Sequence, residues 1–262
     1  MTLDFPITIT GLIVGTIVGA TGVAGGALMT PILVMLFGIA PTTAVGTDLL
    51  YASVTKIFGT AVHQKHGTID WEVVRRLAMG SLPAAALTLW WMHSNGMGSV
   101  KDGVIIFAIG IALGITALGM FFKEQLHNVG TKLRVGDSEH FKAMQPGLTV
   151  LAGVFLGVMV TLTSVGAGAI GTVMLVYLYP LRLVGGRLVG TGLAHAIPLT
   201  LIAGLGHLSL GNVNLPLMVN LLIGSIPGVL IGSFVSARAP AKLVQNSIAG
   251  VLMVVSYKML TH

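Results

Sequence analysis

Four ionisable residues lie in otherwise apolar stretches of the sequence: Asp48, Lys56, Arg187 and His195. A charge in the middle of a membrane helix costs roughly 2.5–3.5 kcal/mol on insertion scales, so such residues need an aqueous cavity or a partner. Lysine, arginine and protonated histidine attract anions, and aspartate or histidine can carry a proton. We therefore predict an anion-binding site at Lys56, Arg187 and His195, with Asp48 and His195 as residues that couple to an ion.

The same residues also have structural interpretations. Arg187 could be an anchor at a helix end, Asp48 a helix-terminal charge, and Lys56 and His195 a pair inside the helix bundle. The sequence aligns Asp48 with Arg187 and Lys56 with His195, both at an offset of 139. Residues eight apart differ by roughly 80° around a helix, so Asp48 and Lys56 can border one cavity, and so can Arg187 and His195.

Two glycine-rich breaks in long apolar stretches form the second candidate site, and they match at an offset of 142, with Thr21 on Thr163 and Gly26 on Gly168. A helix that begins at such a break exposes free N–H groups, which attract anions, and hydroxyl groups add further donors. The alternative is that the glycines only allow close helix packing. The predicted substrate-binding residues of the breaks are Thr21, Gly22, Gly25, Gly26, Thr163, Ser164, Gly166 and Gly168.

Composition sets the class of protein that must position these residues. The chain has 262 residues, of which 54% are hydrophobic and 8% charged, whereas soluble domains have about 25% charged residues. It is therefore predicted to be an all-α integral membrane protein with the lipid bilayer as its surroundings. The net charge of +6 does not indicate nucleic-acid binding, because Lys and Arg lie at the ends of apolar stretches.

The chain divides into a first membrane repeat at 1–122, a linker at 123–147 and a second repeat at 148–262. The apolar stretch 5–37 would reach about 50 Å as one helix, too long for one crossing of about 30 Å and too short for two. We therefore expect each repeat to contain a re-entrant or broken helical hairpin and three crossing helices. The expected crossing helices are 41–62, 72–92, 103–122, 184–206, 215–236 and 241–260.

The distribution of positive charge predicts the topology. With both hairpins returning to their own side, 11 of the Lys and Arg residues share one side of the membrane and two lie on the other, with Lys56 inside the bilayer. The positive-inside rule then places the linker in the cytoplasm and both termini outside. Three crossings per repeat is an odd number, so the repeats are expected to have inverted topology.

Motifs for other chemistries are missing from the sequence. It has no GxxxxGK[ST] loop for a nucleotide and no GxSxG nucleophile elbow. His63 and His66 lack the glutamate of a zinc HExxH motif. We therefore expect no cofactor, no metal, no nucleotide and no enzymatic activity. An integral membrane enzyme and an anion channel remain the alternatives to a carrier.

The run GATGVAGGALMTPIL, followed by PTTAVGTDLL and by a second copy ending in PLRLVGGRLVGTGLAHAIPLT, resembles the sulfite exporter TauE/SafE family, also described as the sulfonate uptake permease group. The resemblance covers essentially the whole chain. It implies a secondary transporter in the bacterial inner membrane for small sulfur-containing anions such as sulfite or sulfoacetate. The coupling ion, a proton or sodium, stays open. The second break departs from the first in having Ala167 where the first has Gly25.

Overall fold

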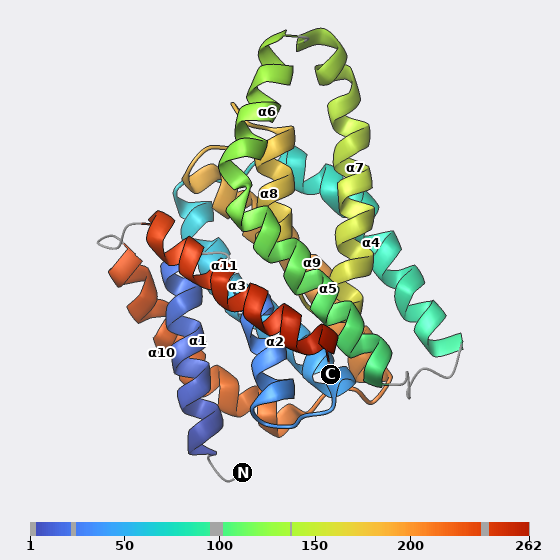
Figure 1. The fold of residues 1–262 in the computed structure, drawn as a ribbon, viewed down its shortest axis with the longest axis vertical. Helices are drawn as coiled ribbons and strands as arrows, with labels where there is room; N and C mark the ends of the chain where they lie inside the picture. Colours follow the sequence, from blue (N-terminus) through green and yellow to red (C-terminus); the bar gives the residue numbers. More distant parts are fainter. Residues whose placement is uncertain (1–3, 22–24, 95–101, 137, 237–240, 262) are drawn as a thin grey trace.

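The computed structural model describes residues 4–21, 25–94, 102–136, 138–236 and 241–261, which form helices and turns without any strand (Figure 1). This confirms the all-α prediction. The first half of the chain contains α1 (Phe5–Thr21), α2 (Gly25–Met35), α3 (Pro41–Lys65), α4 (Trp71–Ser94) and α5 (Asp102–Phe121). The second half contains α6 (Lys123–Gly136), α7 (Ser138–Thr163), α8 (Ala169–Leu178), α9 (Gly186–Ser209), α10 (Leu215–Ser236) and α11 (Ala241–Thr261).

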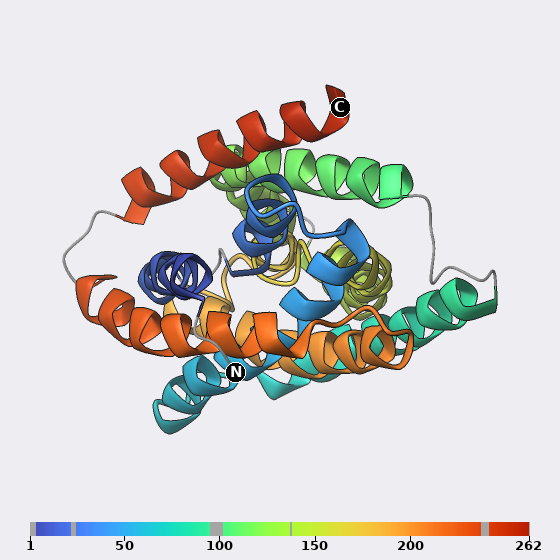
Figure 2. The same cartoon turned by 90° about the horizontal axis from the view of Figure 1, so that it is seen from below.

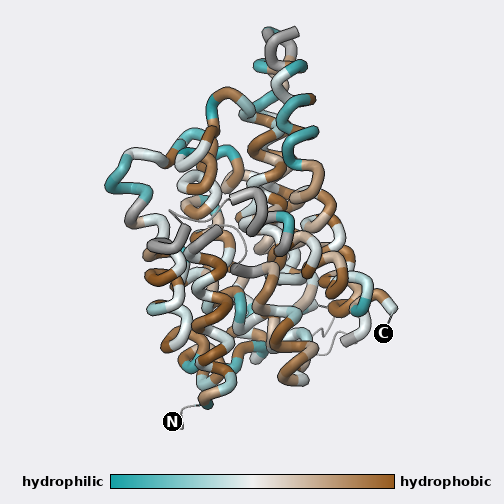
Figure 3. Tube along the Cα trace, turned by 60° about the vertical axis from the view of Figure 1, so that its left-hand side comes forward, coloured by the Kyte–Doolittle hydropathy of each residue, from teal (hydrophilic) through white to brown (hydrophobic). Residues whose placement is uncertain are grey.

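Within the described ranges, four helices are long and apolar enough to cross a membrane: α5, α7, α9 and α10. α3 is also long enough, with 25 residues, but it carries Asp48 and Lys56 and is less apolar. Hydrophilic residues gather at one end of the molecule, around the α6–α7 connection (Figure 3). Elsewhere large apolar side chains cover the surface, as expected for contact with lipid, among them Leu87, Trp90, Phe107, Leu151, Leu205 and Leu230.

Both predicted hairpins contain a short helix. α2 has 11 residues and α8 has 10, so each is about 15 Å long, roughly half the hydrocarbon thickness. The start of α1 and the α6–α7 connection lie at opposite ends of the molecule (Figures 1 and 3), so the two hairpins enter from opposite ends. Seen from below, the hairpins lie between α5 and α11 on one side and α4 and α10 on the other (Figure 2).

The charged segment 123–147, which the sequence predicts to be a linker, is helical. It forms α6 and the first turns of α7. Leu126 and Gly130 lie one turn apart on α6, and a Cβ at Gly130 would overlap the carbonyl oxygen of Tyr177 in α8. Phe141 of α7 packs edge-on against the Tyr177 ring with centroids 6.3 Å apart. Parts of the segment therefore pack on α8 of the second half.

The first helix of each hairpin packs on a helix of the other half of the chain: α1 on α10, and α7 on α4. The backbones touch at both crossings, because a Cβ at Gly11 would overlap the carbonyl oxygen of Leu221, and a Cβ at Gly153 that of Leu77. The numbers of the two glycines differ by 142, and those of their two partners differ by 144. Such equivalent contacts are what two related halves would make, and they show that these glycines serve close packing.

The contacts of α3 and α9 also repeat between the two halves. The amide N–H of Asp70 donates to Thr191 Oγ1 at 3.0 Å, and the amide N–H of Asn214 donates to Thr47 Oγ1 at 3.0 Å. The numbers of Asp70 and Asn214 differ by 144, and so do those of Thr47 and Thr191. The turn that precedes α4 therefore contacts α9 in the way that the turn before α10 contacts α3.

The offset of 139 predicted for these two helices is therefore wrong. Pro41 begins α3, whereas Pro180 lies in the turn before α9, which begins at Gly186. The two prolines thus resemble each other in sequence without occupying equivalent places. At the offset of 144 the equivalent pairs are Asp48 and Gly192, Tyr51 and His195, and Lys56 and Thr200.

Candidate functional site

Asp48 joins α3 to both hairpins. Thr30 Oγ1 of α2 donates to Asp48 Oδ2 at 2.6 Å, and Ser164 Oγ, from the break between α7 and α8, donates to the same oxygen at 2.9 Å. The Asp48 side chain is fully buried, and its Oδ1 has no hydrogen-bond partner in the described part of the chain. A buried carboxylate oxygen without a donor is costly, which suits a group that exchanges an ion.

The break between α7 and α8 adopts a backbone that places Ser164 against Asp48. Ser164 has a φ of 59° and is the one non-glycine residue with positive φ in the described ranges. Gly166 follows with a φ of 111°. A positive φ is strained for a residue with a Cβ, so the surrounding packing must hold Ser164 in place.

Thr163 forms hydrogen bonds with the backbone at the same break between α7 and α8. Its hydroxyl donates to the carbonyl oxygen of Met159 at 2.6 Å and accepts the amide N–H of Val165 at 3.1 Å. The Thr163 hydroxyl is thus engaged with the backbone, whereas the sequence had suggested it as a donor to the substrate.

Lys56 lies eight residues after Asp48, about 12 Å further along α3, and is 8% exposed. It lines a cavity of about 10 Å³, here called the Lys56 cavity, together with Ala167, Gly168 and Thr172 of the second hairpin and Val189 and Gly192 of α9. That volume is close to the smallest that holds one water molecule. Within the described residues the Lys56 ammonium has no hydrogen bond and no ion pair.

The beginning of α8 adds positive potential to the Lys56 cavity. Gly168 is the N-cap of α8 and provides no side-chain cap, so the first N–H groups of the helix carry the partial positive charge of a helix N-terminus, about half a unit. Gly168 and Lys56 line the same cavity. The structure therefore brings together the predicted buried cation and the predicted helix start of the second break.

His195 is buried on α9, and its Nε2 lies 2.8 Å from Ser81 Oγ of α4. It does not line the Lys56 cavity, although its neighbour Ala196 does. Tyr51, the counterpart of His195 on α3, lies next to Ser225 of α10, although neither hydroxyl has a hydrogen bond to a described residue. The pair of His195 on α9 and Ser81 on α4 is thus equivalent to the pair of Tyr51 on α3 and Ser225 on α10.

Arg187 lies away from Lys56, at the surface. Its side chain is 52% exposed, and its guanidinium is 3.5 Å from Asp70 Oδ2. The Arg182 guanidinium donates to both carboxylate oxygens of Asp70, at 2.6 and 2.8 Å, and to Glu72 Oε2 at 2.6 Å. Arg187 is therefore part of an ion-pair network between the α3–α4 turn and the α8–α9 turn. Nothing in this geometry directs it at a substrate in the Lys56 cavity.

The first break is described in part. Gly22 lies outside the described residues, and the helix ends at Thr21 and Gly25 are placed without a description of the side chains around them. Gly26 is the second residue of α2. The prediction that these residues contact the substrate stays a prediction.

Sequence reasoning missed Thr30 and Ser81. Thr30 lies inside the run GATGVAGGALMTPIL, and Ser81 belongs to Gly80-Ser81-Leu82-Pro83, which repeats at Gly224-Ser225-Ile226-Pro227. The repeated serine was a usable signal. Among the described residues no group of three or more His, Cys, Asp or Glu side chains is placed to hold a metal ion.

A helical membrane protein with short hairpins and a buried cation between its halves has the features of a membrane transporter, and comparison with known proteins agrees. The profile of the family described as Sulfite exporter TauE/SafE matches residues 7–259, so the chain belongs to this family. It is 39% identical over 260 residues to the Probable membrane transporter protein YjnA of Bacillus subtilis (strain 168), covering 98% of this chain and 100% of the relative.

A second relative from the same organism, the Probable membrane transporter protein YdhB, is 24% identical over 240 residues, which is 90% of this chain and 91% of the relative. No solved structure matches the chain. The family and these relatives show a multi-pass membrane transporter.

Proposed function

We propose that the protein is a secondary transporter that moves small anions through the Lys56 cavity by alternating access. The observation that supports this most directly is a buried ammonium without an ion pair beside the uncapped N-terminus of α8. The cavity is formed by α3 from the first half and by the second hairpin and α9 from the second half. A site between two related halves is typical of secondary transporters.

The charge of Lys56 provides the binding energy. The Lys56 ammonium interacts with Asp48 only at long range and forms no ion pair with it. Its burial is therefore destabilising, and a bound anion would compensate for the hydration that the ammonium has lost. At a separation of 4 Å the attraction is about 4 kcal/mol with an effective dielectric constant of 20. Together with the family description, this favours sulfur oxyanions and sulfonates, such as sulfite and sulfoacetate, as the substrate class.

The Lys56 cavity is too small for a sulfur oxyanion in this structure, because about 10 Å³ holds one water at most. Binding therefore requires α3 to move relative to α8 and α9. There is free space beside Gly192 of α9 for this movement, since a Cβ added there meets nothing within 4 Å. A site that opens only after such a movement favours a carrier over a channel, whose conducting state needs a continuous path.

Asp48 is the proposed coupling residue, with His195 as a second titratable group. The Asp48 carboxylate contacts α2 and the second break, so a proton or sodium ion at its free Oδ1 would act on both hairpins. The structure favours neither ion. His195 touches α4 through Ser81, and a change in its protonation would alter that contact.

The proposal includes an orientation. Residues 1–122 and 148–262 form two repeats of inverted topology in the bacterial inner membrane, with both termini outside and 123–147 in the cytoplasm. The support is the uneven distribution of Lys and Arg between the two sides, together with the equivalent contacts of the two halves and the opposite directions of the hairpins.

The decisive test is anion binding to the purified protein, using sulfite, thiosulfate, sulfoacetate and taurine, followed by uptake into vesicles. We expect at least one to bind, with saturable uptake as for a carrier. Lys56→Met should weaken that binding at least tenfold, because it removes the opposite charge at the site. It should leave the melting temperature of the anion-free protein unchanged or higher, because a buried unpaired charge is removed.

Lys65→Met is the matched control, since Lys65 lies exposed at the end of the same helix. This variant should bind the anion with the affinity of the parent. If Lys56→Met binds with the affinity of the parent, the Lys56 cavity is not the anion site. If it loses binding only because the protein melts at a lower temperature, Lys56 has a structural role.

A further inference from the structure

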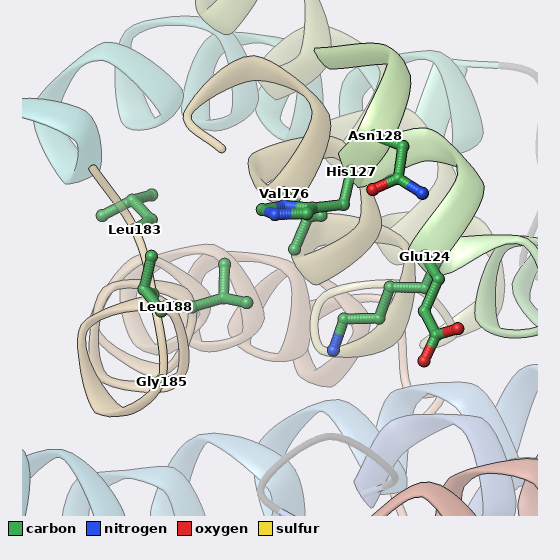
Figure 4. Close-up of a pocket in the computed structure, with 9 residues that line it drawn as sticks. Glu124, His127, Asn128, Val176, Leu183, Gly185 and Leu188 are labelled. Atoms are coloured by element: carbon green, nitrogen blue, oxygen red, sulfur yellow. The ribbon is translucent and has the colours of Figure 1, made fainter. Parts of the chain in front are cut away.

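A second and larger pocket lies between α6 and the end of α8. It has a volume of about 410 Å³ and opens to the surface. Lys123, His127 and Asn128 of α6 line one part of it, and Val176, Leu183 and Leu188 line another part. Figure 4 shows the His127 ring beside Val176, with Leu183 and Leu188 to the left of both. We refer to it as the α6 pocket. With both repeats oriented as proposed above, this pocket faces the cytoplasm.

The α6 wall of this pocket offers hydrogen-bond donors to an anion. Lysine donates through its ammonium, histidine through its ring and asparagine through its amide. Burial lowers the pKa of Lys123, so its ammonium is partly removed from water and gains from a negative partner. Glu124 also lines the pocket, but its carboxylate is directed away from His127 and Leu188 (Figure 4).

The α6 pocket and the Lys56 cavity occupy successive turns of one groove between α8 and α9. On α8, Thr172 lines the Lys56 cavity, and Val176, one turn later, lines the α6 pocket. On α9, Leu188 lines the α6 pocket, and the next residue, Val189, lines the Lys56 cavity. One helical turn is about 5.4 Å, so the two spaces are neighbours. Val176 and Leu188, 5% and 7% exposed, line the α6 pocket but not the Lys56 cavity.

We infer that the α6 pocket is an outer binding site for the transported anion on the cytoplasmic side. Val176 and Leu188 form the closure that separates it from the Lys56 cavity. The inference rests on the proposed transport function. An anion from the cytoplasm first binds at Lys123, His127 and Asn128, and it passes to Lys56 when the groove between α8 and α9 widens.

The chain has no cysteine, so a single introduced thiol reports on the α6 pocket. We would place it at Asn128 and measure its reaction with anionic sulfonatoethyl and cationic trimethylammonioethyl methanethiosulfonate in lipid-free detergent. After correction for their rates with a free thiol, the anionic reagent should react roughly fivefold or more faster. The matched control is Val129→Cys, the adjacent exposed residue that does not line the pocket, where the two rates should be similar.

Lys123→Gln should remove most of this preference at Asn128→Cys. Lys142→Gln, which deletes the same charge from an exposed position outside the pocket, should retain it. Sulfoacetate should slow labelling at Asn128→Cys and not at Val129→Cys. Equal rates for the two reagents, or an unchanged preference in Lys123→Gln, would overturn the outer site. Protection by anionic phospholipid but not by sulfoacetate would also overturn it.

The connection to Lys56 has its own test. Gly192 lines the Lys56 cavity, and a Cβ added there meets nothing within 4 Å. The thiol of Gly192→Cys should react slowly with the anionic reagent. Leu188→Ala should accelerate this reaction several-fold, whereas Leu181→Ala, at an exposed position of the α8–α9 turn, should not. No acceleration in Leu188→Ala would refute the connection.

The labelling rates do not depend on transport, so the two proposals fail in different ways. A parent protein that binds none of the four anions but keeps the charge preference at Asn128→Cys would refute the transport function and, with it, the role of this pocket in transport. A parent that binds sulfoacetate at Lys56 without any charge preference at Asn128→Cys would refute the outer site alone.

Discussion

At the scale of single residues, the fold holds two opposite charges on one helix without joining them. Asp48 and Lys56 are both buried on α3, yet they form no ion pair, and Asp48 is bound by hydroxyl groups instead. Buried charges usually pair with each other, because leaving each one alone costs several kcal/mol. Their separation by two helical turns keeps Lys56 available for an anion and Asp48 for a coupling ion.

Ser164 provides a residue-scale prediction, because its two contributions to stability oppose each other. Ser164→Gly removes the hydrogen bond to Asp48 and also the strain of the positive φ, whereas Ser164→Ala removes the hydrogen bond and keeps the strain. A residue with a Cβ in this region costs about 1–2 kcal/mol relative to glycine. We expect Ser164→Ala to melt at the lower temperature of the two, with transport impaired in both.

The comparison has a built-in control, since both variants lose the same donor to Asp48. Equal melting temperatures would show that the backbone at Ser164 is not strained. Transport at the parent's rate in both variants would show that the Ser164–Asp48 hydrogen bond has no part in function.

At the scale of elements, the helices that cross between the halves depend on glycine. Gly153→Ala should destabilise the protein by about 1–3 kcal/mol, because its Cβ would overlap the carbonyl oxygen of Leu77 and force α7 away from α4. Gly147→Ala on the same helix is the control: a Cβ there meets nothing within 4 Å, and alanine should be neutral or stabilising by about 0.5–1 kcal/mol. Thermal unfolding in detergent compares the two, and similar melting temperatures would contradict this account of the crossing.

The ion-pair network between the α3–α4 and α8–α9 turns provides a pH-dependent prediction. The hydrogen bond from Arg182 lowers the pKa of Glu72 below its ordinary value of 4.5. The carboxylate is therefore favoured in the folded state, and its contribution to stability is present above about pH 4.5 and lost as the pH falls further. Because the pair is exposed, Glu72→Gln should lower the melting temperature by about 1–3 °C at pH 7, with the difference from the parent shrinking toward pH 4.

Glu139→Gln, at an exposed position of α7, removes the same charge outside this network and should change the melting temperature less at pH 7. A difference between Glu72→Gln and the parent that grows as the pH falls would contradict the sign of the Glu72 contribution.

At the scale of the whole molecule, the hairpins and the charge distribution predict which turns face which side of the membrane. Leu36, in the α2–α3 turn, is 76% exposed, and Leu181, in the α8–α9 turn, is 60% exposed. Single cysteines at these positions should react with a membrane-impermeant maleimide from opposite sides, Leu36→Cys from outside and Leu181→Cys from the cytoplasm. Val129→Cys on α6 should behave as Leu181→Cys does. Labelling of both turns from one side would refute the inverted hairpins.

The sequence by itself determined the class of protein and the parts of the site. Apolar composition, the lengths of the apolar stretches and the glycine-rich breaks are local properties, because helix formation and membrane insertion depend on neighbouring residues. They were enough to predict an all-α membrane protein, most helix bounds to within a few residues, and Asp48 and Lys56 as buried charges. They did not predict that the charged segment 123–147 is helical and contacts α8.

Only the tertiary structure decided which of these residues meet. Ser164 reaches Asp48 across the two halves, and Arg187 turns to Asp70 at the surface, because helix rotation and crossing depend on side chains far apart in sequence. The offset between α3 and α9 was wrong for the same reason: local similarity aligned two prolines, whereas the contacts between the halves align Thr47 with Thr191. The Lys56 cavity also exists only through packing, since its walls come from α3, the second hairpin and α9.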